Sequence, residues 1–286
     1  AGGEIATYHQ LCDRRVREAG RKPAFGAPGA FRRMEADFAT LVREQPDPAW
    51  QFDELIIDEG QDFTEPWRDA LLALLKPAGR AWWLEDPLQN LYDRPPVALP
   101  GWVGLSADTN YRTPADVLAL LNARLPLPAP VRAGSPVTDS EPEIFAWRDE
   151  AGLMDATKRA ITRALGLGFR RDAIVLLTFR GREHSRFTPL DHLGPHRLRA
   201  FTGRYDLLGE PEHSQGELLI DSVYRFKGQS APCILFTEID FETTGGRMDE
   251  LTMRKLFVGA TRATMKLILV ASERAAAALA PVAEAG

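Results

Sequence analysis

Short apolar runs along the chain predict strands that are buried in the interior of a sheet. Each run has three to five residues and is followed by polar or turn-forming positions, a pattern typical of buried parallel strands. The runs lie at residues 55–57, 81–84, 174–178, 234–237 and 267–270.

Two of the segments between these runs have apolar residues at helical spacing. Residues 65–75 carry a leucine stripe, and residues 114–121 begin with Pro114, which suits the first turn of a helix after Thr113. Strands that alternate with helices favour an α/β architecture with largely parallel sheets. Proline and glycine cluster at 95–101, and we place the boundary between two domains within residues 95–108.

The composition narrows the class of protein. Of 286 residues, 44% are hydrophobic and 26% are charged, which excludes global disorder. There is no apolar run of about 18 residues and no signal-like start, so neither a membrane span nor secretion is expected. The two cysteines, Cys12 and Cys233, cannot build a disulfide framework or a cysteine-based zinc site. We therefore expect a cytoplasmic protein.

The net charge of -5 excludes a globally basic nucleic-acid coat, so any contact with nucleic acid must be local. Residues 14–33 contain seven Arg or Lys and one acid, Glu18, which gives a local charge of +6. This segment has two interpretations, a surface that follows phosphates or a solvated helix face with its loop.

Asp58 and Glu59 follow the apolar run at 55–57. The carboxyl end of a strand is where ligands bind in open α/β sheets. There Asp58 would hold Mg²⁺, which prefers a few carboxylates together with phosphate oxygens, and Glu59 would orient or deprotonate a water. The alternative is a structural role for the two acids in a helix cap or loop.

Further segments place this acidic pair in a known context. In chain order they are ATYH at 6–9, DEGQD at 58–62, LEDPLQNLY at 84–92, NYRT at 110–113, SVYRFKGQ at 222–229 and LFVGATRA at 256–263. These segments resemble, in the same order, motifs of the UvrD/Rep-like superfamily 1 DNA helicases. DEGQD is similar to the Walker B motif of that family.

The resemblance implies a P-loop NTPase (RecA-like) fold. Residues 1–105 would be the remainder of a first RecA-like domain, and residues 106–286 a second one with parallel sheets and a short insertion around 180–216. ATP and Mg²⁺ would bind in the cleft between the domains. The protein would move along single-stranded DNA or at single/double-strand junctions, in the 3′ to 5′ direction by the form of its Walker B motif.

The resemblance also assigns roles to residues on the nucleotide side. Asp58 would hold Mg²⁺, Glu59 would act on the attacking water, and Gln61 and Gln89 would sense the γ-phosphate. Tyr111 would stack on the adenine, and Arg112 and Arg262 would act as arginine fingers, for which a planar guanidinium suits better than an amine. Lys227 and Gly228 would form the turn that connects nucleotide and DNA contacts.

On the DNA side the resemblance points to Thr7, His9, Arg94, Ser222, Tyr224 and Arg225. Hydroxyl groups position a strand without reading its sequence, and aromatic rings stack on any base. Two of these positions depart from the family. Tyr224 stands where the family has histidine, and a half-buried strand tyrosine is the alternative role. Arg94 stands where a tryptophan is usual, and an arginine can still stack.

The GxxxxGK[ST] phosphate loop is absent from the sequence. Because the family has this loop before the first motif, we expect the chain to be the C-terminal portion of a longer helicase that hydrolyses ATP poorly or not at all by itself. Two other functions stay open. One is a non-catalytic helicase-like scaffold that acts through protein contacts, and the other is a nuclease or phosphohydrolase built on Asp58, Glu59 and Asp62.

Overall fold

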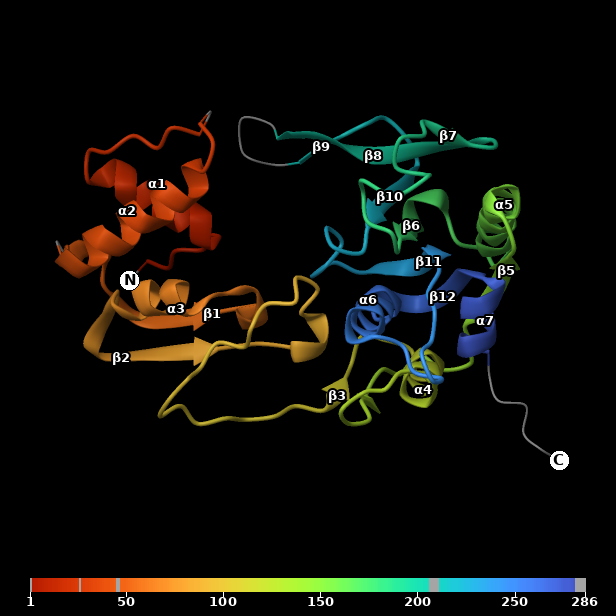
Figure 1. Cartoon of the computed structure of the whole chain (residues 1–286), viewed down its shortest axis with the longest axis horizontal. Coiled ribbons are helices and arrows are strands. Elements are labelled where there is room, and N and C mark those ends of the chain that lie inside the picture. The colour runs from red at the N-terminus through yellow and green to blue at the C-terminus, as the bar shows by residue number, and fades with distance from the viewer. Residues whose placement is uncertain (1, 26, 45–46, 206–210, 281–286) are drawn as a thin grey trace. The chain divides into compact units, whose positions relative to one another are not determined.

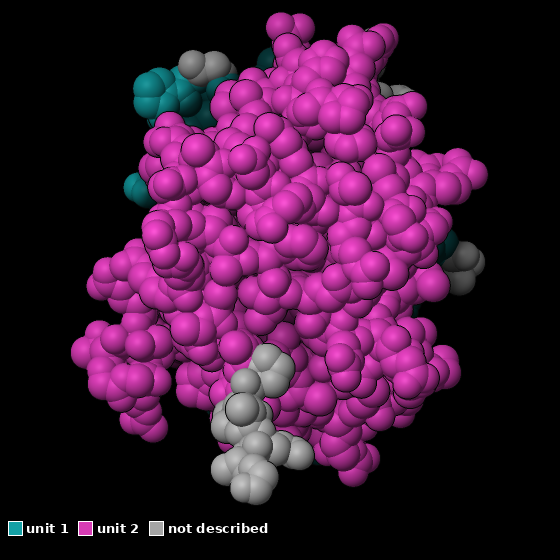
Figure 2. All heavy atoms as spheres, turned by 90° about the vertical axis from the view of Figure 1, so that its right-hand side faces the viewer, with its two compact units in different colours: residues 1–103 teal, residues 104–286 magenta. Residues whose placement is uncertain are grey.

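The computed structural model describes residues 2–25, 27–44, 47–205 and 211–280. Within this part of the chain the backbone forms two compact units, residues 1–103 and residues 104–286, which Figure 2 shows in different colours. Each unit is built around its own group of buried apolar side chains. No helix among the described residues is both long enough and apolar enough to cross a bilayer.

Unit 1 combines helices with a small parallel sheet (Figure 1). Its strands β1 and β2 pair in parallel and end together, with Ile57 opposite Trp83. The elements are α1 (Tyr8–Glu18), α2 (Ala30–Glu44), β1 (Phe52–Ile57), α3 (Glu65–Leu72) and β2 (Leu75–Trp83). Short 3-10 turns lie at Pro48–Trp50, Gly60–Asp62 and Pro87–Gln89.

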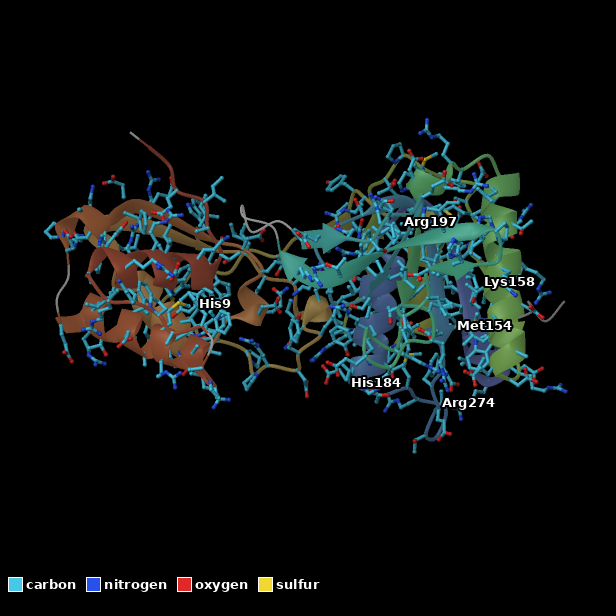
Figure 3. The ribbon with its side chains drawn as sticks, turned by 90° about the horizontal axis from the view of Figure 1, so that it is seen from above. His9, Met154, Lys158, His184, Arg197 and Arg274 are labelled. Carbon is cyan, nitrogen blue, oxygen red and sulfur yellow. The ribbon has the colours of Figure 1, made fainter. Side chains whose placement is uncertain are left out.

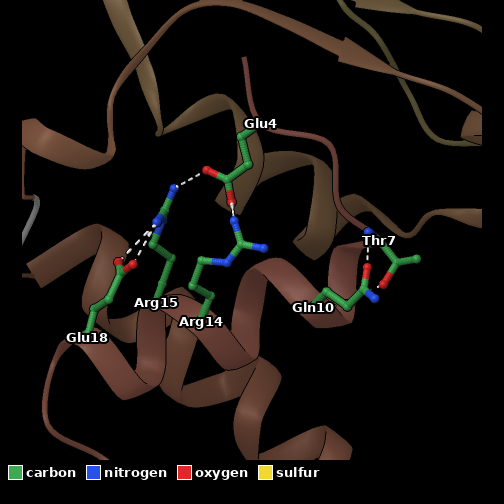
Figure 4. Close-up of polar contacts among 6 residues, drawn as sticks. All are labelled: Glu4, Thr7, Gln10, Arg14, Arg15 and Glu18. Carbon is green, nitrogen blue, oxygen red and sulfur yellow. Dashed lines mark hydrogen bonds and ion pairs between the residues drawn. The ribbon is translucent and has the colours of Figure 1, made fainter. Parts of the chain in front are cut away.

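The helices of unit 1 pack through one apolar face each. In α1 a capping box fixes the first turn, because the Thr7 side chain accepts from the N–H of Gln10 and the Gln10 side chain accepts from the N–H of Thr7 (Figure 4). Phe38 of α2 is fully buried and its ring meets that of Tyr8 edge to face. These contacts hold α1 and α2 against α3 and the sheet.

Unit 2 is organised around an eight-stranded sheet with the order β5-β12-β11-β6-β10-β8-β7, in which β9 also pairs with β8. All neighbours from β5 to β8 are parallel, and β7 and β9 run antiparallel to β8. The strands are β5 (Glu143–Trp147), β6 (Ile174–Thr178), β7 (His192–Leu193), β8 (His196–Tyr205), β9 (Pro211–His213), β10 (Leu218–Ser222), β11 (Ala231–Ile239) and β12 (Ala263–Ser272).

Helices lie on both faces of this sheet. The apolar face of α5 (Glu150–Gly166) packs on the alternate strand residues that include Leu176 and Leu235. On the other face α6 (Glu250–Ala260) approaches β11 so closely that a Cβ at Gly259 would lie 2.2 Å from the ring of Phe236. The remaining elements are β3 (Thr109–Asn110), α4 (Ala115–Arg124), β4 (Arg132–Ala133) and α7 (Glu273–Leu279).

The prediction of an α/β fold with largely parallel sheets is confirmed. The run at 174–178 coincides with β6, and those at 234–237 and 267–270 lie within β11 and β12. The helix predicted at 65–75 ends earlier, at Leu72, because the chain turns there into β2. The run at 81–84 is only the end of that strand, which reaches Trp83 and begins at Leu75.

The segment predicted as an insertion, 180–216, contributes β7, β8 and β9. Of these strands, β8 lies in the main sheet next to β10. Residues 206–210 of this segment are outside the described residues. Arg197 and Arg199 are exposed on β8, where Figure 3 labels Arg197.

Candidate functional site

The acidic motif of unit 1 lies where β1 and β2 end. Asp58 and Glu59 follow β1, and Glu85 and Asp86 follow β2 shortly after Trp83. Because the strands are parallel and in register at Ile57 and Trp83, both acidic segments lie at the same edge of the sheet.

Gln61 connects these two segments. Its amide nitrogen donates to the Glu59 carboxylate at 2.5 Å, and its amide oxygen accepts from the backbone N–H of Asp86 at 2.9 Å. The side chain is buried, with 6% of its surface exposed. A movement of the Glu59 carboxylate would therefore shift the Gln61 amide and, through it, the backbone at Asp86.

The backbone at the acidic pair is unusual. Glu59 has a φ of 54°, in the left-handed region that non-glycine residues rarely adopt. The next residue must be glycine, because a Cβ at Gly60 would lie 2.2 Å from the indole nitrogen of Trp83. The close approach lets the N–H of Gly60 donate to the carbonyl of Leu84 at 2.8 Å.

Asp58 fits a magnesium ligand. Its side chain is exposed, and one of its carboxylate oxygens accepts from the N–H of Glu59 at 2.9 Å, which fixes the rotamer. An exposed, oriented carboxylate is what Mg²⁺ needs when phosphate and water supply its other ligands. The side chain of Gln89 is fixed in the segment after β2, because its amide nitrogen donates to the Asp86 carboxylate at 2.8 Å.

The N-terminal residues predicted to contact DNA have partners within unit 1. Thr7 is the cap of α1, and the His9 ring nitrogen Nε2 is 2.8 Å from the Glu35 carboxylate. Between them Tyr8 is buried, and its ring stacks on Trp67 with centroids 4.4 Å apart. Burial raises the pKa of the Tyr8 hydroxyl well above its ordinary value. Tyr8 is thus a packing residue of this segment.

Arg94 stacks in unit 1. Its guanidinium carbon lies 5.1 Å from the centroid of the Trp67 ring and 5.9 Å from that of Tyr92. Its Nη1 donates at 2.5 Å to the carbonyl of Asp62, the last residue of the acidic motif. Arg94 therefore joins an aromatic pair to the segment that carries Glu59.

Four of the seven cations in the basic segment at 14–33 form ion pairs. Glu4 pairs with both Arg14 and Arg15, and Glu18 pairs with Arg15 (Figure 4). Arg17 and Arg21 also form ion pairs, with Asp13 and Asp37. The structure favours the interpretation of this segment as a solvated helix face and loop.

In unit 2 the NYRT segment is fixed by an Asn side chain. The Asn110 carboxamide oxygen accepts from the N–H groups of Arg112 and Thr113, both at 2.9 Å. This turn leaves Tyr111 with 76% of its surface exposed, and its ring lies over Gly134, where a Cβ would approach within 2.6 Å. The exposed ring has the position that a stacking residue requires.

Arg262 is buried in unit 2, with 2% of its surface exposed. Its guanidinium donates to the carbonyl of Val258 at 3.0 Å and to that of Gln229 at 3.4 Å. The preceding residue, Thr261, accepts at its carbonyl from the hydroxyl of Thr113 at 3.2 Å. Hydrogen bonds therefore join the segments that contain Arg112, Arg262 and Gln229. Contact of Arg262 with a phosphate stays a prediction.

The segment after β10 forms a turn at the carboxyl end of that strand. The Ser222 hydroxyl accepts from the N–H of Arg225 at 3.3 Å, and Tyr224 lies over Gly181. Gly228 has a φ of +80°, which glycine adopts without strain, as expected for a turn with Lys227.

Three residues have roles in these sites that the sequence did not predict. Asp86 and Thr113 lie inside the motifs, but only their contacts reveal their roles. Asp221, one residue before Ser222, is buried beside Arg225, and this burial raises the pKa of its carboxyl. An acid that follows Leu-Leu-Ile in β10 was an available signal.

One family model matches a segment of unit 2. Residues 217–270 match the family model described as UvrD-like helicase C-terminal domain. Among solved structures, the chain is similar to the C-terminal domain of a possible DNA helicase from Lactobacillus plantarum WCFS1, with 13% identity and a TM-score of 0.41. That similarity covers 61% of this chain and 95% of the other. No curated protein matches the chain.

Proposed function

Because residues 217–270 match the UvrD-like helicase C-terminal domain, we propose that the chain is part of an ATP-dependent superfamily 1 DNA helicase or translocase. It couples ATP hydrolysis to movement on single-stranded DNA, with 3′ to 5′ polarity. The matched segment contains both the SVYRFKGQ and the LFVGATRA motifs.

On the nucleotide side, the residues of unit 1 act at the edge where β1 and β2 end. Asp58 holds Mg²⁺, which neutralises phosphate charge when it is bound. Glu59 orients the attacking water and accepts its proton, and the Gln61 amide holds the Glu59 carboxylate in place. Gln89, fixed by Asp86, senses the γ-phosphate.

In unit 2, the exposed ring of Tyr111 stacks on the adenine and Arg112 approaches the phosphates. Arg262 reaches the phosphates when its hydrogen bonds to the carbonyls of Val258 and Gln229 are replaced by hydrogen bonds to phosphate oxygens. Since Gln229 ends the segment that contains Tyr224 and Arg225, this exchange couples nucleotide binding to the DNA contacts.

One observation carries the proposal. The three motifs of unit 2 are far apart in sequence, yet hydrogen bonds from Thr113 to Thr261 and from Arg262 to Gln229 join them. The connection brings together the segments that carry Arg112, Arg262 and Gln229, as a shared nucleotide site requires.

The sequence lacks a phosphate loop, so the test uses the product of the complete open reading frame. We expect ATP hydrolysis that single-stranded DNA stimulates and that Glu59→Gln abolishes. Glu54→Gln is the matched control, because Glu54 lies on β1, the strand that leads to Glu59, and among the described residues its carboxylate accepts from the indole N–H of Trp82 alone. Unwinding of duplexes with a 3′ or a 5′ tail tests the polarity. A folded protein that binds DNA without hydrolysing ATP would favour the scaffold.

A further inference from the structure

One face of β8 carries two arginines followed by a phenylalanine. Side chains alternate along a strand, and Leu198 and Ala200 belong to the apolar cluster under α5. Arg197, Arg199 and Phe201 therefore lie on the opposite face of the strand, where both arginines are exposed.

Two guanidinium groups meet at Phe201. The guanidinium carbon of Arg225 is 3.7 Å from the centroid of the Phe201 ring, and that of Arg182 is 4.9 Å from it. Arg225 follows β10 and Arg182 follows β6, so three strands contribute to this contact. Two like charges beside one ring repel each other, and an anion that lies close to both offsets this repulsion.

The position of Arg182 is fixed by its surroundings. Its Nη2 donates to the carbonyl of Phe201 at 3.2 Å, and its own carbonyl accepts from the hydroxyl of Thr188 at 2.8 Å. The guanidinium passes over Gly203, where a Cβ would lie 3.4 Å from Nη2. Arg182 therefore lies directly along the backbone of β8.

Carboxylates balance these two arginines only in part. Arg225 is 3.4 Å from Asp221, a buried carboxylate that accepts from the N–H of Ser222 and also interacts electrostatically with Arg182, so one carboxylate faces two cations. In the part of the chain that the structure describes, Arg182 has no ion pair. By contrast, Arg274 after β12 is paired with both Asp240 and Glu242.

Aromatic and cationic groups continue next to this cluster. The Lys255 ammonium lies 5.1 Å from the Phe179 ring and 5.5 Å from the Tyr224 ring. Phe179 and Lys255 line a cavity of about 630 Å³. Cations interleaved with aromatic rings are typical of surfaces that bind single strands without reading their sequence.

We propose that Arg182 and Arg225, both held against the ring of Phe201, form a clamp for the phosphodiester backbone of single-stranded nucleic acid. Phe201 is a positioning residue, because the arginines occupy its ring and it acts through them. The inference rests on the proposed function and adds Arg182 and Phe201, which lie outside every motif, to its DNA side.

The test measures binding of a labelled oligo(dT) strand to the whole chain over a series of salt concentrations. We expect Arg182→Gln to weaken binding about tenfold and to reduce the slope of log affinity against log salt by about 0.7, the value for one lost phosphate contact. Phe201→Leu weakens binding similarly, and Phe201→Tyr restores it. Arg170→Gln, an exposed arginine beyond the opposite end of β6, leaves binding unchanged.

The outcomes separate the two proposals. If the wild-type chain binds the strand and both Arg182→Gln and Phe201→Leu bind with unchanged affinity and slope, the clamp is wrong and the helicase function stands. If the wild-type chain does not bind single strands at all, the DNA side of the proposed function is overturned, and the clamp with it. Because Arg182 is exposed, its substitution tests the clamp even if Phe201→Leu fails to fold.

Discussion

The hydroxyl of Thr113 donates to the carbonyl of Thr261 across 148 positions of sequence. Both residues are buried, with 0% and 2% of their surfaces exposed. The bond fixes the start of α4 to the end of α6, and Arg112 and Arg262 are the immediate neighbours of its two partners. The two arginines of the candidate site are therefore positioned by one connection between threonines.

Replacement of Thr113 by valine tests this connection. The substitution keeps the shape and leaves the Thr261 carbonyl without its donor, so we expect unit 2 to lose about 1–3 kcal/mol of unfolding free energy. Chemical denaturation followed by circular dichroism measures the change. Thr162→Val is the control, since that hydroxyl donates only to Lys158 within an exposed helix face. Equal effects of the two substitutions would contradict the role assigned to Thr113.

Gly259→Ala tests the packing of α6 on β11. The added methyl group would lie 2.2 Å from the Phe236 ring, so the helix must shift, and we expect a loss of about 1–3 kcal/mol or more. Phe236→Leu in the same protein should recover part of this loss. Gly166→Ala in α5 meets open space and should be neutral or stabilising. A tolerated Gly259→Ala would show that α6 does not pack this closely.

Gln61→Glu tests the link at the acidic edge of unit 1. The new carboxylate lies where an amide now donates to Glu59, so two negative charges are adjacent at pH 7. We expect unit 1 to be destabilised by about 1–3 kcal/mol at pH 7, and by less near pH 4, where one carboxyl is protonated. Tryptophan fluorescence reports on this unit, because five of the six tryptophans lie at or before residue 102. Gln51→Glu controls for added charge, and a loss independent of pH would argue against the link.

His196 makes the stability of unit 2 depend on pH. Burial lowers the pKa of its imidazole, helped by the charge of Arg171. The folded protein therefore binds fewer protons than the unfolded chain, so this stability is present above the unfolded pKa of about 6.5 and is lost as the pH falls below it. We expect His196→Gln to flatten the decline of unfolding free energy between pH 7.5 and 5.5. His192→Gln, at an exposed position of β7, should leave the decline unchanged.

The strands that the sequence predicted best are those whose formation depends on the local pattern of apolar residues. All five residues of β6 are buried and four of them are apolar, so hydrophobicity alone predicted that strand. By contrast, β2 begins with Leu-Lys-Pro-Ala-Gly, which indicates a turn, yet Leu75 pairs with β1 and the pairing resumes at Arg80 after a register shift. Only the tertiary partner makes this segment a strand.

In the candidate site, too, the local features were predicted from the sequence and the long-range contacts were not. The motifs located the acidic edge and the turn at Gly228, since fixed residue types at fixed spacing carry that information. The partners that hold these residues come from distant segments, as when Arg182 and Arg225 meet at Phe201. Such contacts depend on strand order, which a single sequence does not specify.

The place of β12 in the sheet affects how unit 2 is made. This strand, the last of the described strands, lies between β5 and β11. Until residues 263–272 have left the ribosome, β5 and β11 cannot be joined, and their facing edges offer unpaired backbone groups. Unit 2 therefore completes its sheet only after residue 272 has been made, and a nascent chain stalled before residue 263 exposes these unpaired strands to aggregation.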